Sequence, residues 1–376
     1  MTHQQPGPLP WHVVQQMTTP PPKTRRSTIR LAVGAFAAIA VGAGAALIPM
    51  PYAIVSPGPA TDVLGSRVAP DGTSTPRIVI EKATTYPTTG ALDFTTVSVR
   101  GGPGYPVNVV DVLSAWIDPA RDVLPVDEVF PPQATKEQVA EENRIEMSAS
   151  QQEAAAVALR ALGYTLPQEV RIGAVPSGSP SEGQLKVGDV LVSIGGVPAT
   201  DPDAVRAAVQ KVTVGDTVEV VVTRDGAELT ARPGTRKAAD GRTVLGIVLT
   251  PSYKLPFPVT IDAGNVGGPS AGLMFSLGIY DKLTDGAMTG GAKIAGTGTI
   301  SDSGAVGPIG GIRQKVIGAQ RAGATFFLAP ADNCGELKDA VPEGITVVKV
   351  ESFEVAKSAV IAIGQGDTSS LPRCGS

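Results

Sequence analysis

The chain has 376 residues, of which 42% are hydrophobic and 18% charged, and its formal net charge is -4. A folded protein of two or three domains with a sizeable core fits this length and composition. Because phosphate binding needs clustered Lys and Arg, and the folded part has no basic stripe, nucleic acid is not expected to be the main partner.

The first predicted element is a transmembrane helix over residues 31–50, which are apolar and carry no charge. A segment of this length crosses a bilayer at about 1.5 Å per residue, and the basic residues ahead of it predict a cytoplasmic N-terminus. Residues 1–30 would then be a disordered cytoplasmic tail, and the rest of this single-pass cell-membrane protein would be extracytoplasmic. A cleaved signal peptide is the alternative, since GAGAA resembles a cleavage site. Both interpretations export residues 51–376.

Residues 51–145 predict a small β-rich segment, because runs such as RIVIEKATTY and ALDFTTVSVR alternate with turn signals. Strong helix formers toward its end predict a helical connector that stops at about residue 163.

Residues 164–240 predict a compact unit of strands around one short helix. Asp201 is suited to cap that helix and Pro202 to begin it. The order SPSEGQLKVGDVLVSIGG, helix, TVEVVVTRDG resembles a PDZ domain of the bacterial protease-associated type. Such domains bind an extended peptide as an added strand. By analogy, Leu162, Gly163, Tyr164 and Thr165 are a weak candidate for the carboxylate-binding loop; the alternative is that Gly163 only ends the connector helix.

Histidine is excluded from any exported active site, because His3 and His12 both precede the apolar segment. The exported part therefore has no Ser–His–Asp triad, Cys–His pair or His-ligated metal. We expect no metal and no cofactor. If Ser270 is a nucleophile, its base must be a lysine or a carboxylate.

Ser270 lies in the stretch GNVGGPSAGLMF, just ahead of an apolar segment at 271–280 that predicts a buried helix. Pro269 is compatible with a helix start, and Gly268 lets a substrate backbone approach. The positive end of the helix dipole and unpaired N–H groups would stabilise an oxyanion there. The alternative role of this serine is that of a helix N-cap.

Lys315 is the candidate base. At 100° per residue, the predicted helix over 312–322 places Lys315 on the same stripe as Ile312, Val316 and Ala319. Burial would lower the pKa of such a lysine toward neutrality. A snorkelling lysine whose amine reaches water is the alternative.

GGPSAG, followed 45 positions after its serine by the lysine of PIGGIRQK, resembles the serine–lysine dyad of the Lon proteolytic domain over about residues 245–362. With the PDZ-like unit, the anchor and the PYxIxxPGP stretch, the whole is similar to membrane-anchored PDZ–Lon bacterial proteases. The resemblance implies that Ser270 is the nucleophile, Lys315 the general base, and Thr297 the group that positions the lysine. Position 267 departs from the family, because many Lon enzymes carry an acidic residue where this chain has glycine.

The sequence thus predicts an α+β multidomain protein in which an anchor, a β-rich segment and a PDZ domain precede a Lon-type Ser–Lys protease domain. Because no G-x-x-x-x-G-K-[ST] motif occurs, no ATP is expected to be used, and the substrates would be polypeptides that are already extended or unfolded. A non-catalytic peptide-binding scaffold and a mainly self-processing protease are the alternatives. The resemblance is in keeping with a ring-shaped homo-oligomer.

Cys334 and Cys374 are the only cysteines. In an oxidising exterior they are expected to form a disulfide that ties down the C-terminal tail at 363–376.

Overall fold

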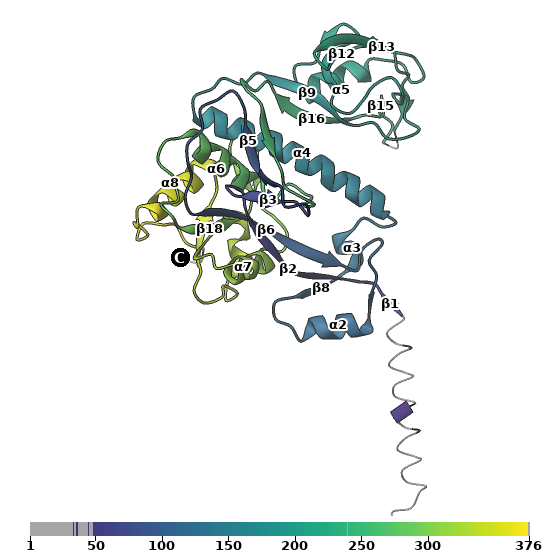
Figure 1. Ribbon diagram of the computed structural model, residues 1–376. Coiled ribbons are helices and arrows are strands. Elements are labelled where there is room, and N and C mark those ends of the chain that lie inside the picture. Colours follow the sequence, from purple (N-terminus) through teal and green to yellow (C-terminus); the bar gives the residue numbers. More distant parts are fainter. Residues whose placement is uncertain (1–32, 34, 37–43, 45–47, 239, 375–376) are drawn as a thin grey trace, which may run out of the picture.

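The computed structural model describes residues 33, 35–36, 44, 48–238 and 240–374 (Figure 1). The predicted cytoplasmic tail at 1–30 and most of the predicted anchor at 31–50 lie outside the described residues. Among the helices that are described, none combines the length and the apolar character needed to cross a membrane.

A six-stranded sheet forms the centre of the larger part of the molecule. In spatial order its strands are β22 (Thr346–Val350), β21 (Phe326–Pro330), β18 (Lys293–Gly296), β6 (Ala91–Arg100), β2 (Tyr52–Asp62) and β8 (Asp122–Pro125). The four strands from β22 to β6 run parallel, and β2 lies antiparallel between β6 and β8.

Helices cover both faces of this sheet. Along β21, Phe327 packs into the core made with α7 (Ile312–Arg321), whereas the next residue, Leu328, packs into the core made with α6 (Gly272–Leu283) and α8 (Phe353–Gly364). Successive side chains of a strand point to opposite faces, so buried strands such as this one are apolar throughout.

The predicted β-rich segment at 51–145 is not a separate unit, because its long strands belong to the same sheet as the C-terminal strands. Ala91 pairs with Lys293 where β6 runs parallel to β18, and the ring of Phe94 lies 5.5 Å from that of Phe275 in α6. The apolar side chains of β6 are buried because β18 and α6, from the C-terminal half of the chain, pack against them. Two segments far apart in sequence therefore form one domain.

The predicted connector helix is α4 (Lys136–Ala161), which begins with a capping box at Thr135. Ala154, Ala155 and Ala158 of α4 lie in the core that also contains α6. Small side chains let the two helices approach closely, and a Cβ at Gly272 of α6 would lie only 2.7 Å from Ser150 Oγ. Helix α4 therefore packs into the core of the larger domain and also connects that domain to the PDZ-like unit.

The PDZ-like unit has its own six-stranded sheet and its own core. Its strands are β13 (Ala227–Ala231), β12 (Val220–Arg224), β10 (Val190–Ile194), β9 (Gln168–Ala174) and β16 (Val248–Tyr253) in spatial order, with β11 (Val197–Pro198) pairing β10. Its helix, α5 (Pro202–Gln210), is capped by Asp201 as predicted. The sheet extends beyond the predicted boundary at residue 240, because β16 pairs with β9 as far as Tyr253.

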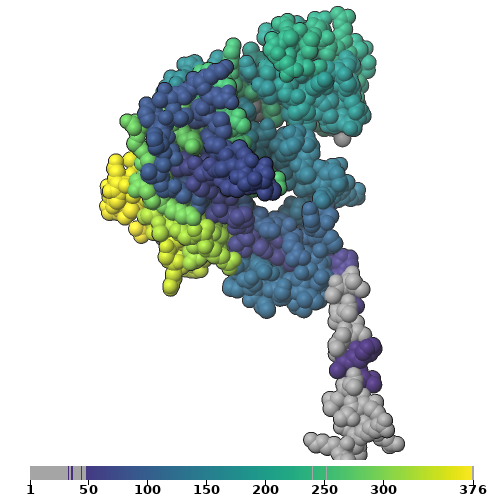
Figure 2. All heavy atoms as spheres, in the orientation of Figure 1, coloured from purple at the N-terminus to yellow at the C-terminus, as the bar shows by residue number. Residues whose placement is uncertain are grey.

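This unit is inserted between α4 and β17 (Val259–Ile261), which pairs with β5 (Ile78–Ile80). The two connecting segments lie side by side, because Lys254 N donates to Pro167 O at 3.0 Å and the rings of Tyr164 and Phe257 are 5.7 Å apart. The inserted unit lies at one end of the molecule, both in the ribbon of Figure 1 and in the space-filling view of Figure 2.

The remaining elements are short. They are β1 (Pro49–Met50), β3 (Ser66–Val68), β4 (Ser74–Pro76), β7 (Val107–Asn108), α2 (Val109–Trp116), α3 (Val126–Val129), β14 (Arg236–Lys237), β15 (Thr243–Val244), β19 (Thr299–Ile300), β20 (Val306–Gly307) and the 3-10 helix η1 (Ala331–Leu337). Cys334 of η1 forms a disulfide with Cys374, and Lys349 N donates to Pro372 O beside it.

Candidate active site

Three predicted site residues meet just beyond the carboxyl end of β18. Lys315 Nζ donates to Ser270 Oγ at 2.8 Å and to Thr297 Oγ1 at 3.0 Å. Ser270 comes from the segment before α6, Thr297 from the residue after β18, and Lys315 from α7. Because α6 and α7 cover opposite faces of the sheet, their side chains can meet only past its edge, where α/β folds commonly place their sites.

Lys315 is buried, with 3% of its surface exposed. Its helix presents Ile312, Val316 and Ala319 to the core, and all three are fully buried. Burial disfavours the ammonium form and lowers the pKa of Lys315 to about 7. The amine does not snorkel to water, because its two hydrogen-bond partners are side-chain hydroxyls of the site.

Thr297 is fully buried and links both partners. Its hydroxyl donates to Ser270 O at 2.9 Å, and Gly298 N donates to the same carbonyl at 2.8 Å. Because a hydroxyl has one proton to donate, Thr297 Oγ1 must accept from Lys315. In its neutral form the amine can turn its lone pair toward Ser270, which then becomes the donor of the 2.8 Å contact, while one N–H still donates to Thr297.

Ser270 does not cap α6. The helix begins at Gly272 with Ala271 as N-cap, and no side chain accepts a hydrogen bond at that cap. The backbone N–H groups of Ser270 and Ala271 have no acceptor among the described residues. Both lie at the helix N-terminus, where the dipole favours negative charge.

Gly268 and Pro269 are held by α4. Gly268 N donates to Asn143 O at 3.0 Å, and the buried Ser150 Oγ donates to Pro269 O at 2.9 Å. A Cβ at Gly267 would lie 2.6 Å from Asn143 Cβ, so the close approach of α4 leaves no room for a side chain at this position.

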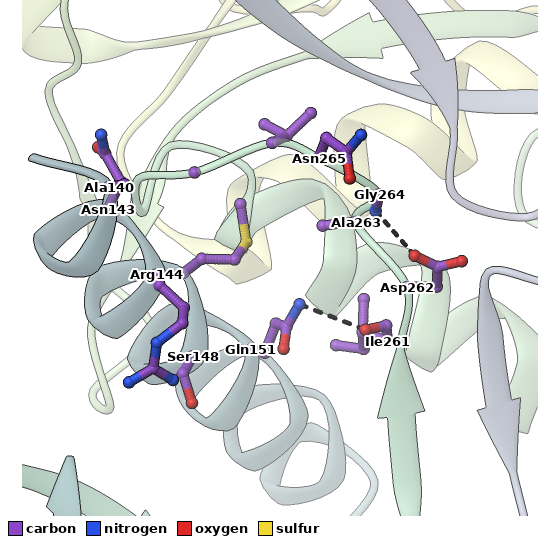
Figure 3. A pocket seen from close by; sticks show the side chains of 13 residues that line it. Ala140, Asn143, Arg144, Ser148, Gln151, Ile261, Asp262, Ala263, Gly264 and Asn265 are labelled. Carbon is purple, nitrogen blue, oxygen red and sulfur yellow. Dashed lines mark hydrogen bonds between the residues drawn. The ribbon is translucent and has the colours of Figure 1, made fainter. Parts of the chain in front are cut away.

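A cleft of about 550 Å³ opens beside this segment, between α4 and residues 261–267. Figure 3 shows the side chains of Arg144 and Gln151 on α4 across from Ile261 and Asp262. Gln151 Nε2 donates to Ile261 O at 3.3 Å, which ties the two walls together at one end. Along this backbone the lining of the cleft ends at Gly267, shortly before Ser270 in the chain.

A second groove, of about 320 Å³, lies in the PDZ-like unit between α5 and residues 242–249. Val205 and Val209 of α5 line it together with Leu245, Ile247 and Leu249. Strand β16 begins at Val248 and is the edge strand of its sheet. This combination of an unpaired strand edge and an apolar groove suits an added peptide strand.

The weak peptide-binding candidates lie elsewhere, and none of them lines this groove. Leu162 is the C-cap of α4, and Gly163 follows it with φ 88°. Tyr164 packs on Phe257, and Thr165 follows in the same connecting segment. A glycine ends an α-helix readily in this conformation, and that is the role of Gly163 here.

Sequence patterns did not point to two sets of residues that lie near these sites. One is the α4 pair Asn143 and Ser150, which hold Gly268 and Pro269 by hydrogen bonds but have no local sequence pattern that distinguishes them. The other is the stretch Leu245–Gly246–Ile247, an apolar–Gly–apolar signal directly before a strand; Gly246 has φ +70°. Within the described ranges, no three His, Cys, Asp or Glu residues are placed to hold a metal ion.

Two family models match the chain. The model described as the Lon protease (S16) C-terminal proteolytic domain matches residues 259–362, and a PDZ domain model matches residues 144–232. The chain therefore carries a PDZ domain and a Lon-type proteolytic domain, which is a serine peptidase domain.

The chain also shows partial similarity to individual proteins. A Lon protease of Clostridium beijerinckii is 37% identical over 120 residues, which cover 31% of this chain and 14% of that protein. Lon protease 1 of Bacillus subtilis is 37% identical over 98 residues, or 25% and 12% of the two chains. The PDZ domain of the SdrC-like protein of Listeria monocytogenes is 22% identical, covers 21% of this chain and 85% of its own, and has a TM-score of 0.21.

Proposed function

We propose that this protein is an ATP-independent serine endopeptidase that hydrolyses extended or unfolded polypeptides with Ser270 as nucleophile and Lys315 as general base. The observation that carries the proposal is the 2.8 Å hydrogen bond between Lys315 Nζ and Ser270 Oγ, made by a lysine whose burial lowers its pKa to about 7. A substantial fraction of this amine is neutral at physiological pH, and a neutral amine can accept the serine proton.

In the acylation step, Ser270 Oγ bonds to the substrate carbonyl carbon while its proton moves to Lys315 Nζ. The oxyanion is stabilised by the backbone N–H groups of Ser270 and Ala271, which have no acceptor among the described residues. Lys315 then returns the proton to the leaving amine as the peptide bond breaks. A water molecule hydrolyses the acyl-enzyme with the same lysine as base.

Thr297 is a positioning residue in this mechanism. It accepts from Lys315 and donates to the carbonyl of Ser270, so it fixes the amine and the nucleophile relative to each other. Such alignment supplies part of the rate enhancement, because misplacement by about 1 Å can cost about 100-fold.

The cleft at α4 and the groove at α5 support the proposal that the substrates are polypeptides. The cleft at α4 adjoins the backbone that leads to Ser270, and the groove at α5 offers the edge of β16 to an extended peptide. The PDZ domain would bind or gate chains that the proteolytic domain cuts. A folded substrate would need to unfold first.

The proposed location is the outer side of the cytoplasmic membrane, with residues 31–50 as a single anchor. The disulfide between Cys334 and Cys374 supports export, since such bonds persist mainly in oxidising compartments.

The function is tested by incubating purified full-length protein and its Ser270→Ala and Lys315→Met variants with casein, in the absence and presence of ATP. We expect the wild type to cleave equally in both conditions and both variants to lose cleavage while keeping a native circular dichroism spectrum. Ser358→Ala, at an exposed position on α8, is the matched control.

Retained activity in Ser270→Ala would contradict the assigned nucleophile. A wild type that binds casein without cutting it would support the scaffold alternative, and cleavage of the purified chain alone, read by mass spectrometry, would support self-processing.

A further inference from the structure

Helix α2 presents an unusual cluster of exposed apolar side chains. Val110, Leu113, Trp116 and Ile117 are 56%, 53%, 64% and 85% exposed. At 100° per residue they lie within an arc of about 120° on one side of the helix. We call these four side chains the α2 apolar face.

The opposite side of α2 anchors the helix to the domain. Val112 and Ala115 are 2% and 0% exposed and pack with Ile54 and Val107. Asn108 caps the helix, and its capping box with Asp111 is complete. The α2 apolar face is therefore held outward by a well-formed helix, and an apolar face of this kind on a stable element marks an interaction site.

The position of α2 in the chain identifies its partner. The apolar run of residues 31–50 ends in β1, where Pro49 pairs with Asn108 and Met50 with Val107. The end of that run is thus hydrogen-bonded beside the N-cap of α2. In Figure 1, β1 and α2 lie together at one end of the molecule, and the PDZ strands β12 and β13 lie at the other.

We infer that the α2 apolar face docks on the lipid bilayer surface, beside the point where residues 31–50 leave it. Trp116 suits the boundary between acyl chains and headgroups, because its ring is amphipathic. The inference rests on the proposed membrane anchor and is independent of peptide hydrolysis.

Charge adds little to this contact. The neighbouring ionic groups are paired with each other, Arg100 with Asp111 at 3.4 Å and Arg121 with Asp118 at 3.0 Å. The face itself carries no charged side chain. We therefore expect docking on zwitterionic vesicles, without a requirement for anionic lipid.

Docking would have a geometric consequence. A single chain connection lets a domain rotate freely above a membrane, whereas a second contact at α2 fixes its tilt. The PDZ domain, at the far end of the molecule, would then be held away from the bilayer and toward incoming chains.

Tryptophan fluorescence tests the inference directly, because the chain contains only Trp11 and Trp116. The full-length Trp11→Phe variant, with Trp116 as its one tryptophan, is reconstituted in phosphatidylcholine vesicles with ordinary or brominated acyl chains. We expect Trp116 emission to be lost in brominated vesicles and to resist quenching by aqueous acrylamide. Leu113→Asp in the same background should restore the emission and the acrylamide access.

Val187→Asp is the matched control, since Val187 in the PDZ domain is also 53% exposed; it should leave the quenching unchanged. Flotation of the vesicles separates the two proposals. Protein that floats but is quenched only by acrylamide overturns docking and leaves the anchor standing. Protection of Trp116 from both quenchers would show that α2 packs on a second copy of the chain, which also overturns docking. Protein that does not float with the vesicles would overturn both the membrane anchor and the docking of α2.

Discussion

Among the residues that the structure describes, no carboxylate pairs with Lys315 to offset its burial; its hydrogen-bond partners are the hydroxyls of Ser270 and Thr297. A charged amine is costly there, so the balance shifts to the neutral form and the pKa falls to about 7. The direction of the expected pH dependence follows from the role of the amine as a proton acceptor. The protonated lysine cannot accept a proton from Ser270, so we expect activity to be lost as the pH falls below this pKa and to be gained as it rises above it.

The pH profile of peptide cleavage should therefore rise through a midpoint near 7, in agreement with the lowered pKa of Lys315. It is measured as kcat/KM for a short fluorogenic peptide. Lys315→Arg should be inactive at every pH of the series, because a guanidinium cannot deprotonate at usable pH. A pH-independent wild type, or an active arginine variant, would be incompatible with a neutral-amine base.

At the scale of single elements, α4 does more than connect two units. Asn143 O of this helix accepts a hydrogen bond from Gly268 N, and Ser150 Oγ donates one to Pro269 O. The helix therefore holds the backbone just before Ser270. Position 267 must be small for the same reason. The same stretch of α4, residues 140–151, therefore lines the cleft and holds the backbone just before Ser270.

Ser150→Ala should lower kcat by about tenfold with little change in KM, because the loss loosens the segment that carries the nucleophile without altering the cleft wall. The free energy of unfolding should fall by about 1 kcal/mol. Steady-state kinetics and urea unfolding measure the two effects. Gln152→Ala, two residues along and therefore on the other side of α4, is the control; an equal loss of kcat in that variant would indicate a general effect on the helix.

At the scale of the whole molecule, the PDZ domain is an insertion within the proteolytic domain. Its first and last strands, β9 and β16, pair with each other, and Gln168 faces Tyr253 where the chain leaves and rejoins. Each unit has its own hydrophobic core. The two can therefore act as separate folding units joined by a two-stranded stem.

Replacing residues 169–252 by Asn-Gly should close this stem as a two-residue hairpin and leave the proteolytic domain folded. We expect cleavage of a short peptide to keep its kcat/KM, while cleavage of a long unfolded chain slows because the groove at α5 is gone. Both rates are compared with those of the full chain. Equal loss of both would mean that the inserted domain is needed to assemble the dyad.

The sequence alone was enough to select Ser270 and Lys315 as the candidate dyad. With His3 and His12 both ahead of the apolar segment, a lysine or a carboxylate was left as the base, and the helical periodicity of 312–322 put Lys315 on the buried stripe. Helix α7 and the capped helix α5 were both predicted correctly. These are local properties, since periodicity and capping depend on residues within a few positions of each other.

Only the tertiary structure decided what distant segments do together. The pairing of Ala91 with Lys293 makes one sheet of two predicted units, and α4, predicted as a connector, lies against the segment that carries Ser270. The apolar groove of the PDZ-like unit lies between α5 and residues 242–249, and none of Leu162–Thr165 lines it. Strand partners and helix contacts depend on which surfaces meet when the chain collapses, and no local pattern of side chains specifies that choice.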